Sequence, residues 1–379
     1  MSAAPAERQE KQPASDEVTE VAPGILRLQL PINLPGLGHV NCYALEDERG
    51  FTLVDPGLPS PDSFAALQHR MAQVGATPDD VHTVFVTHSH PDHFGGAGRL
   101  RIAHGAAVVA HEHFSTVFDP HDDSIELSAV SDRSASTASA DTGRTSTGRE
   151  DVSVFVDLLM GSGAIDEMPT RPAPWGGNLP IPSKIEFEHM RSWDELTKRG
   201  FITPQPTVRI ADAEVFRMGR RDWVAVHTPG HTGDHLCLYD PVEGILLSGD
   251  HVLPSITPHI SGMTQSAGSL ADFFAALLKV AELDGITSVL PAHGHPFADL
   301  RGRTEAIARH HHERLDTLVA IGVQLGESDV VEYSHHLFKE RSWGSMAESE
   351  TYAHLEHLRL AGRAHRRDVA GIPRYLVTD

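Results

Sequence analysis

Cysteine is scarce in this chain of 379 residues, and its scarcity excludes two ways of organising a fold. Only Cys42 and Cys237 are present, so neither a framework of several disulfides nor a zinc cluster of cysteine thiolates can hold the structure together. Both lie in apolar runs typical of β-strands. We therefore expect both cysteines to be small buried side chains.

Basic residues and long apolar runs are also few. The chain has 31 basic against 52 acidic side chains, and its formal net charge of −21 disfavours general attraction to nucleic acid or to an anionic membrane. No uncharged apolar run is long enough to cross a bilayer, and the N-terminus has no apolar signal segment. These absences lead us to expect a cytoplasmic protein without a membrane anchor.

The pattern of apolar residues predicts an α/β fold with one large domain and one small domain. Residues 1–20 have no periodicity and few apolar side chains, which predicts a disordered tail. Residues 21–320 alternate short strands with amphipathic helices and should form the main domain. Residues 321–379 should form a small C-terminal domain, with a helix over 349–360 and a hairpin over 363–377.

An insertion over residues 113–205 interrupts the rhythm of strands. Its serine- and threonine-rich part, residues 128–150, predicts a disordered loop. Helices are expected over 152–161 and 192–198. The large apolar side chains of the insertion either form a lid or wall beside a substrate or attach the insertion to the main domain. They are Phe155, Leu158, Met160, Trp175 and Trp193.

A histidine-rich stretch, Thr87 to His93, follows a β-branched run and holds four potential metal ligands. His88 and His90 can share one ion, because a single residue separates them on chain that leaves a strand. Asp92 and His93 extend toward a second position. Three more candidates each follow an apolar strand, and the whole set predicts two divalent metal ions; these candidates are His231, Asp250 and His293.

Imidazoles and carboxylates at two metal ions are suited to hydrolysis. Ions roughly 3.5 to 4 Å apart can share a hydroxide whose pKa falls toward about 7, so no serine or cysteine nucleophile is needed. These ligands suit zinc, which we expect, and also iron or manganese. By contrast, we expect no second metal cluster at His310-His311-His312, because consecutive residues of a helix point in different directions.

Four segments together resemble the metallo-β-lactamase superfamily of hydrolases: residues 88–93, 228–231, 248–250 and 292–294. The resemblance covers residues 24 to about 300 apart from the insertion. It implies an αββα sandwich, with the site on the rim between two sheets.

The resemblance also implies a role for each ligand. His88, His90 and His231 would bind one metal, and Asp250 would bridge to a second metal held by the remaining ligands, Asp92, His93 and His293. Asp55 matches an aspartate that orients a ligand histidine from outside the ligand set, with a turn-capping aspartate as the alternative.

The branch within this superfamily follows from further details. Neither cysteine lies where antibiotic-cleaving members of the first class place a metal-binding cysteine. The pattern of Asp92 and Asp250 is more similar to the glyoxalase II, lactonase and ribonuclease branches. The C-terminal residues look like the winged-helix tail of a branch similar to human β-lactamase-like protein 2.

Three functions are compatible with these residues. The first is a hydrolase of a small ester, thioester or lactone, in which the shared hydroxide attacks and Asp92 passes a proton to the leaving group. The second is a ribonuclease or phosphodiesterase that holds nucleic acid with a basic C-terminal cluster. The acidic net charge disfavours this function and favours a solvated face or a dimer contact for the cluster. The third is a non-catalytic metal-binding protein. The basic cluster consists of Arg359, Arg363, Arg366, Arg367 and Arg374.

Overall fold

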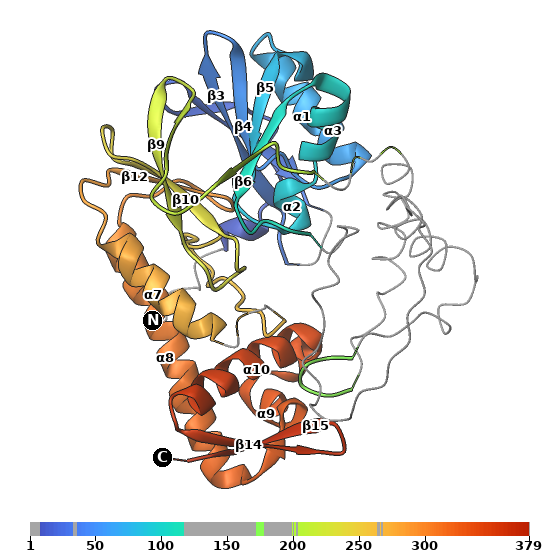
Figure 1. Ribbon diagram of the computed structural model, residues 1–379, viewed down its shortest axis with the longest axis vertical. Helices are drawn as coiled ribbons and strands as arrows, with labels where there is room; N and C mark the ends of the chain where they lie inside the picture. Colours follow the sequence, from blue (N-terminus) through green and yellow to red (C-terminus); the bar gives the residue numbers. More distant parts are fainter. Residues whose placement is uncertain are drawn as a thin grey trace, which may run out of the picture.

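The computed structural model describes residues 8–32, 36–116, 172–177, 199, 201, 204–263, 266 and 268–378. Two sheets pack face to face, and helices cover the outer face of each sheet (Figure 1). The expectation of a mixed α/β fold built on two sheets is confirmed.

The first sheet runs in the order β1-β2-β3-β4-β5-β6-β7. Its first four strands are antiparallel, whereas β5, β6 and β7 each run parallel to the preceding neighbour. The strands are β1 (Thr19–Ala22), β2 (Ile25–Pro31), β3 (His39–Asp47), β4 (Gly50–Val54), β5 (Val81–Phe85), β6 (Ala107–His111) and β7 (Val208–Ile210).

Helices α1 (Pro61–Gln73) and α3 (Ala97–His104) cover the outer face of the first sheet. The hydroxyl of Ser60 accepts a hydrogen bond from the Ser63 amide, so Ser60 caps the start of α1. Phe64, Leu67 and Met71 follow at helical spacing and pack on the sheet, as the apolar pattern predicts. Two short pieces flank β5: a 3₁₀-helix (Pro78–Asp80) and α2 (Pro91–Phe94).

The second sheet runs in the order β12-β11-β10-β9-β8. Side chains such as Tyr43, Phe85 and Trp223 fill the space between the two sheets. On the outer face lie α7 (Ser269–Ala281) and α8 (Leu300–Leu325), and α8 begins where the Asp299 carboxylate accepts from the Gly302 amide. The strands are β8 (Val215–Met218), β9 (Arg221–His227), β10 (Leu236–Asp240), β11 (Ile245–Gly249) and β12 (Ser288–Pro291).

The C-terminal segment forms a compact group at the opposite end of the molecule from α1 and α3 (Figure 1). It contains the expected hairpin, with its turn at Ala370 and Gly371, and a third sheet of order β13-β15-β14. Its buried side chains, among them Tyr333 and Tyr375, belong to the same apolar cluster as Phe273 of α7. The elements are β13 (Ser328–Asp329), α9 (Val330–Leu337), a 3₁₀-helix (Glu340–Ser342), α10 (Ser345–Leu360), β14 (Ala364–Val369) and β15 (Ile372–Val377).

The expected disordered tail over residues 1–20 is wrong for residues 8–20. A 3₁₀-helix (Gln9–Lys11) buries Glu10 completely, and the Glu10 carboxylate accepts hydrogen bonds from the amides of Ser255 and Ile256. The Arg70 guanidinium also donates to the Ser15 carbonyl. Polar contacts with distant segments hold this stretch, and such contacts leave no apolar periodicity in the sequence. Residues 1–7 lie outside the described residues.

Most of the expected insertion lies outside the described residues. This part includes its expected helices, the loop over 128–150 and the large apolar side chains of the predicted lid or attachment other than Trp175. Trp175 is described and buried. Its indole N–H donates to Glu348 of α10 (2.9 Å), and its ring lies against Tyr352. Trp175 therefore attaches its segment to the C-terminal helices. Within the described part of the chain, every helix is too short or too polar to span a bilayer.

Candidate metal centre

The predicted ligands meet at one edge of the two sheets. The loop after β5 carries His88, His90, Asp92 and His93, and loops after β9, β11 and β12 carry the other three. All seven side chains fall into two groups whose potential ligand atoms lie within 4.8 Å of one another. One group contains His88, His90, His231 and Asp250, and the other contains Asp92, His93 and His293.

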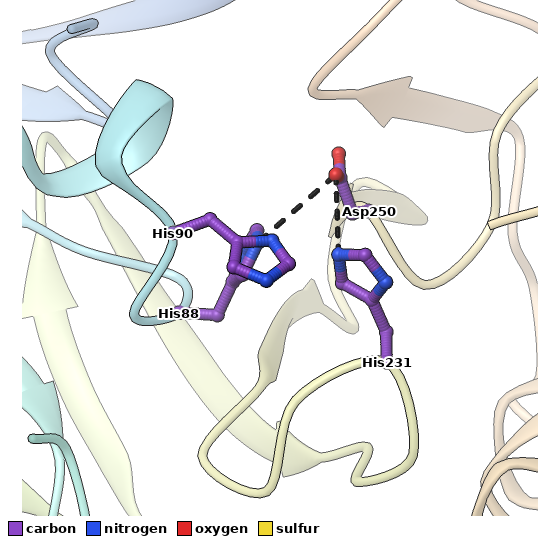
Figure 2. A group of neighbouring side chains, drawn as sticks. All are labelled: His88, His90, His231 and Asp250. Atoms are coloured by element: carbon purple, nitrogen blue, oxygen red, sulfur yellow. Dashed lines mark hydrogen bonds and ion pairs between the residues drawn. The ribbon is translucent and has the colours of Figure 1, made fainter. Parts of the chain in front are cut away.

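The first group is shown in Figure 2, where three imidazoles and a carboxylate point toward one another. His88 Nε2 lies 3.1 Å from His90 Nδ1. Asp250 Oδ2 lies 3.4 Å from His231 Nε2 and 4.0 Å from His88 Nε2. Four donor atoms thus surround one point, although His231 is far from the other histidines in sequence.

Asp250 also faces the second group. Its Oδ1 lies 3.2 Å from His293 Nε2, and its Oδ2 lies 3.6 Å from His93 Nε2. Asp92 Oδ2 is 3.5 Å from each of these two histidine nitrogens. The Asp250 carboxylate therefore stands between the two groups, which is the position of a bridging ligand.

Several atoms of these groups are buried without a hydrogen-bond partner. They are Nε2 of His93, His231 and His293, and Oδ1 of Asp250. Leaving a buried polar atom unsatisfied costs about 1 to 3 kcal/mol. Four such atoms directed at one region fit metal ions as their partners, and the ligand types suit borderline divalent metals.

Three of the candidate ligand histidines are oriented through their Nδ1 atoms. His93 Nδ1–H donates to Asp55 Oδ2 (2.8 Å), His231 Nδ1–H to the carbonyl of His259 (2.7 Å), and His293 Nδ1–H to the carbonyl of His39 (2.6 Å). Each of these bonds leaves Nε2 as the lone-pair nitrogen toward the centre.

Asp55 holds the start of the motif as well as His93. Its Oδ1 accepts from the Thr87 amide (2.8 Å), and its Oδ2 accepts from the Thr87 hydroxyl (2.7 Å). Asp55 adopts a positive φ of 55°, a conformation that costs free energy for a residue other than glycine. The sharp turn after β4 therefore brings the carboxylate under the histidine loop, where the resemblance places an orienting aspartate.

The backbone at Asp250 is fixed by His235, for which the sequence pattern indicates only a place in a strand. His235 Nε2 accepts a hydrogen bond from the Asp250 amide (3.0 Å), and its Nδ1 lies 2.7 Å from the Thr228 hydroxyl. Gly249 has a φ of 50°, and a Cβ there would lie 2.5 Å from His235 Nε2. Only glycine permits this close approach.

Burial and the neighbouring charges shift the pKa values of the side chains at this centre. Burial alone would lower the pKa of His93, but the carboxylates of Asp92, Asp250 and Asp55 raise it well above its ordinary value. Burial would raise the pKa of Asp250, but His293 and His93 hold it well below its ordinary value. The pKa of His90 is lowered to about 3, chiefly by burial and then by His231. His93 of the second group thus lies in a more negatively charged environment than His90 of the first group.

Residues 251–262 form the loop that follows Asp250 and contains His259, whose carbonyl supports His231. Hydrogen bonds with two distant residues hold this loop. Glu10 accepts from the Ser255 amide (2.8 Å) and the Ile256 amide (3.0 Å). Arg303 of α8 donates to the carbonyls of Leu253 and Ile256 (2.5 Å each). We call Glu10 and Arg303 the loop clamp. No local sequence pattern predicts the loop clamp, because both of its residues are distant along the chain from the loop that they hold.

A model of the metallo-beta-lactamase superfamily matches residues 35–295. A metallo-beta-lactamase family protein from Thermus thermophilus has a similar crystal structure, with a TM-score of 0.67, 27% identity and coverage of 94% of this chain and 100% of that one.

Curated relatives match over a shorter range. An atrochrysone carboxyl ACP thioesterase of Aspergillus novofumigatus is 32% identical over 30% of this chain and 34% of its own length. A hydroxyacylglutathione hydrolase of Francisella tularensis subsp. novicida is 25% identical over 25% of this chain and 37% of its own. The chain spans about a third of the length of these relatives.

Proposed function

Because the chain belongs to the metallo-beta-lactamase superfamily, we propose that it is a hydrolase of small thioesters, esters or lactones that works with two divalent metal ions. The observation that carries the proposal is the position of Asp250. Its two oxygens face ligand groups on either side, so one carboxylate is placed to bridge two ions. A centre with one ion would not need ligands on both sides of this residue.

The proposed ligands are His88, His90 and His231 for one ion and Asp92, His93 and His293 for the other, with Asp250 shared. Zinc is the proposed metal. Two such ions would lower the pKa of a water molecule and polarise the carbonyl of the substrate. Asp55 would keep His93 in the tautomer that binds metal through Nε2.

The side chains of the centre also define how a substrate approaches. His88, His93 and His293 are fully buried, whereas His90 is partly exposed. The substrate would therefore arrive beside His90. Asp92, whose pKa is held below its ordinary value by His93 and His293 despite its burial, is ionised and can receive a proton for transfer to the leaving group.

Thioesters are the substrates we favour, since two matching relatives are named as a thioesterase and as a hydroxyacylglutathione hydrolase.

The proposed hydrolase domain comprises residues 21–320, and residues 321–379 form a proposed winged-helix-like domain. Its core is continuous with that of α7, so the two would fold together.

Ion pairing in the C-terminal segment argues against the ribonuclease alternative. Arg359 pairs with Glu356, and Arg367 pairs with Glu327. Arg366 pairs with both Glu356 and Asp368. Three members of the basic cluster therefore already have acidic partners, which reduces the positive charge available to phosphates.

The test combines metal analysis with a panel of thioesters, esters, lactones, β-lactams and RNA. We expect purified protein to contain two zinc ions at the centre and to hydrolyse thioesters. His90→Ala should remove this turnover, whereas the control His335→Ala, which changes a histidine stacked on Trp343, should retain it. Turnover that is unchanged in His90→Ala, with the protein still folded, would refute the proposal.

A further inference from the structure

A separate group of buried metal-ligating side chains lies between α8 and α10. His311 comes from α8, and Glu350 and His354 come from successive turns of α10. Each offers one nitrogen or oxygen, and these three atoms lie within 4.8 Å of one another. None of the three belongs to the metal centre described above. The expectation of no second cluster considered a single helix, whereas here two of the side chains come from another helix.

The two imidazoles are arranged as in the metal centre. His311 Nδ1 lies 3.1 Å from His354 Nε2, the same separation as between His88 Nε2 and His90 Nδ1. His354 Nδ1–H donates to the Glu350 carbonyl (2.7 Å), so His354 Nε2 carries the free lone pair. This lone pair faces His311.

Both rings are neutral at physiological pH, which is the form that binds metal. Burial, aided by Arg314 and His357, outweighs the neighbouring Glu350, so the pKa of His354 falls to about 4. Burial, followed by the effect of His354, lowers the pKa of His311 to about 2. Neither ring therefore needs to lose a proton before an ion binds.

Glu350 supplies the carboxylate. Its Oε1 is paired with Arg314, and its Oε2 lies 3.6 Å from His259 Nδ1. Arg314 thus orients the carboxylate and leaves Oε2 for another partner, as residues around metal sites commonly do. His259 adds a further imidazole beside the group.

A hydrogen bond between the two rings would by itself account for their 3.1 Å separation. It would not account for a carboxylate oxygen that lies within 4.8 Å of a nitrogen of each ring. We propose that His311, Glu350 and His354 bind a divalent transition metal ion and that the ion fastens α8 to α10. This site is independent of the proposed hydrolase activity.

The site should bind zinc more weakly than the metal centre. It has one carboxylate, which is shared with the cation Arg314, whereas the centre contains both Asp92 and Asp250. Coulombic stabilisation of a divalent ion is therefore smaller between the helices. In a series of chelators of increasing zinc affinity, the weaker chelators should remove this ion before they remove zinc from the metal centre.

The test counts zinc ions per chain in the full-length protein equilibrated at several concentrations of free zinc. We expect His354→Gln and His311→Gln to bind one zinc ion fewer than the unaltered protein. Glutamine keeps a hydrogen-bonding side chain but is a poor zinc ligand. The matched control is His357→Gln, one turn further along α10, where the ring packs against Phe274. His259 is left unchanged because its carbonyl supports His231.

A second readout does not depend on variants. Anomalous diffraction at the zinc edge from crystals of the unaltered protein should show a peak between His311 and His354. Zinc content that is the same in the His354→Gln, His311→Gln and His357→Gln proteins would overturn the proposal. Should the two glutamine variants fail to fold, the absence of that peak at saturating zinc would overturn it instead.

Discussion

The two sides of the metal centre are built in different ways. On one side, a single loop after β5 carries His88, His90, Asp92 and His93, and its support comes from Asp55 at the end of the adjacent strand. On the other side, three loops each deliver one ligand. Their supports are distant in sequence: His39 holds His293, and Glu10 holds the loop that follows Asp250. A local motif therefore defines one half of the site, and long-range packing defines the other.

The largest effect should come from the residue that joins the two sides. Asp250→Ala removes the carboxylate that faces both ligand groups, so we expect thioester turnover to fall by more than about 100-fold, the upper range for residues outside the ligand set. Metal content should fall with it. Measurements of kcat/KM and bound zinc would check this, with exposed Asp212→Ala as the control. Equal losses in both variants would contradict a bridging role.

On the motif side, Asp55→Asn should weaken metal binding about 10- to 100-fold. Asparagine can still accept from His93 or Thr87, but the negative charge that favours the Nδ1–H tautomer is lost. Competition with a zinc chelator would measure the change. A zinc affinity equal to that of the unaltered protein would mean that Asp55 serves only the turn after β4.

On the other side, Glu10→Gln should lower the free energy of unfolding by about 1 to 3 kcal/mol, because a buried hydrogen-bonded carboxylate is lost. Its effect on zinc affinity should be smaller than that of Asp55→Asn, since Arg303 still holds the same loop. Denaturant unfolding and chelator competition on the two variants would rank them. A larger loss of affinity in Glu10→Gln would reverse our comparison of the two sides.

The smallest effect concerns pH. Burial would raise the pKa of Glu10, but hydrogen bonds from the Ser255 side chain and from backbone amides lower it below 4.5. A carboxyl group with a lowered folded-state pKa contributes stability above its unfolded pKa and loses it as the pH falls through the folded value. The stability difference between unaltered protein and Glu10→Gln should therefore be full at pH 7 and shrink below about pH 4.5. A difference that is constant down to about pH 3 would exclude this linkage.

Much of the fold follows from patterns along the chain. Short apolar runs such as that of β3 and the amphipathic spacing of Phe64, Leu67 and Met71 predict the strands and α1 correctly. The 3₁₀-helix at Glu10 does not follow from such patterns, because it depends on polar contacts with residues far along the chain. No pattern in the sequence predicts α9, whose Tyr333 is buried where α8, α10 and β15 pack against this helix.

The sequence by itself determined the candidate ligands of the centre, because the spacing of His88, His90, Asp92 and His93 is local and each remaining candidate follows an apolar strand. Tertiary structure alone decided which atoms support them, because His39, His235, His259 and the loop clamp act across long separations. The same reason applies to the group at His311. Adjacent histidines on one helix diverge, and only the packing of α10 against α8 brings Glu350 and His354 beside one of them.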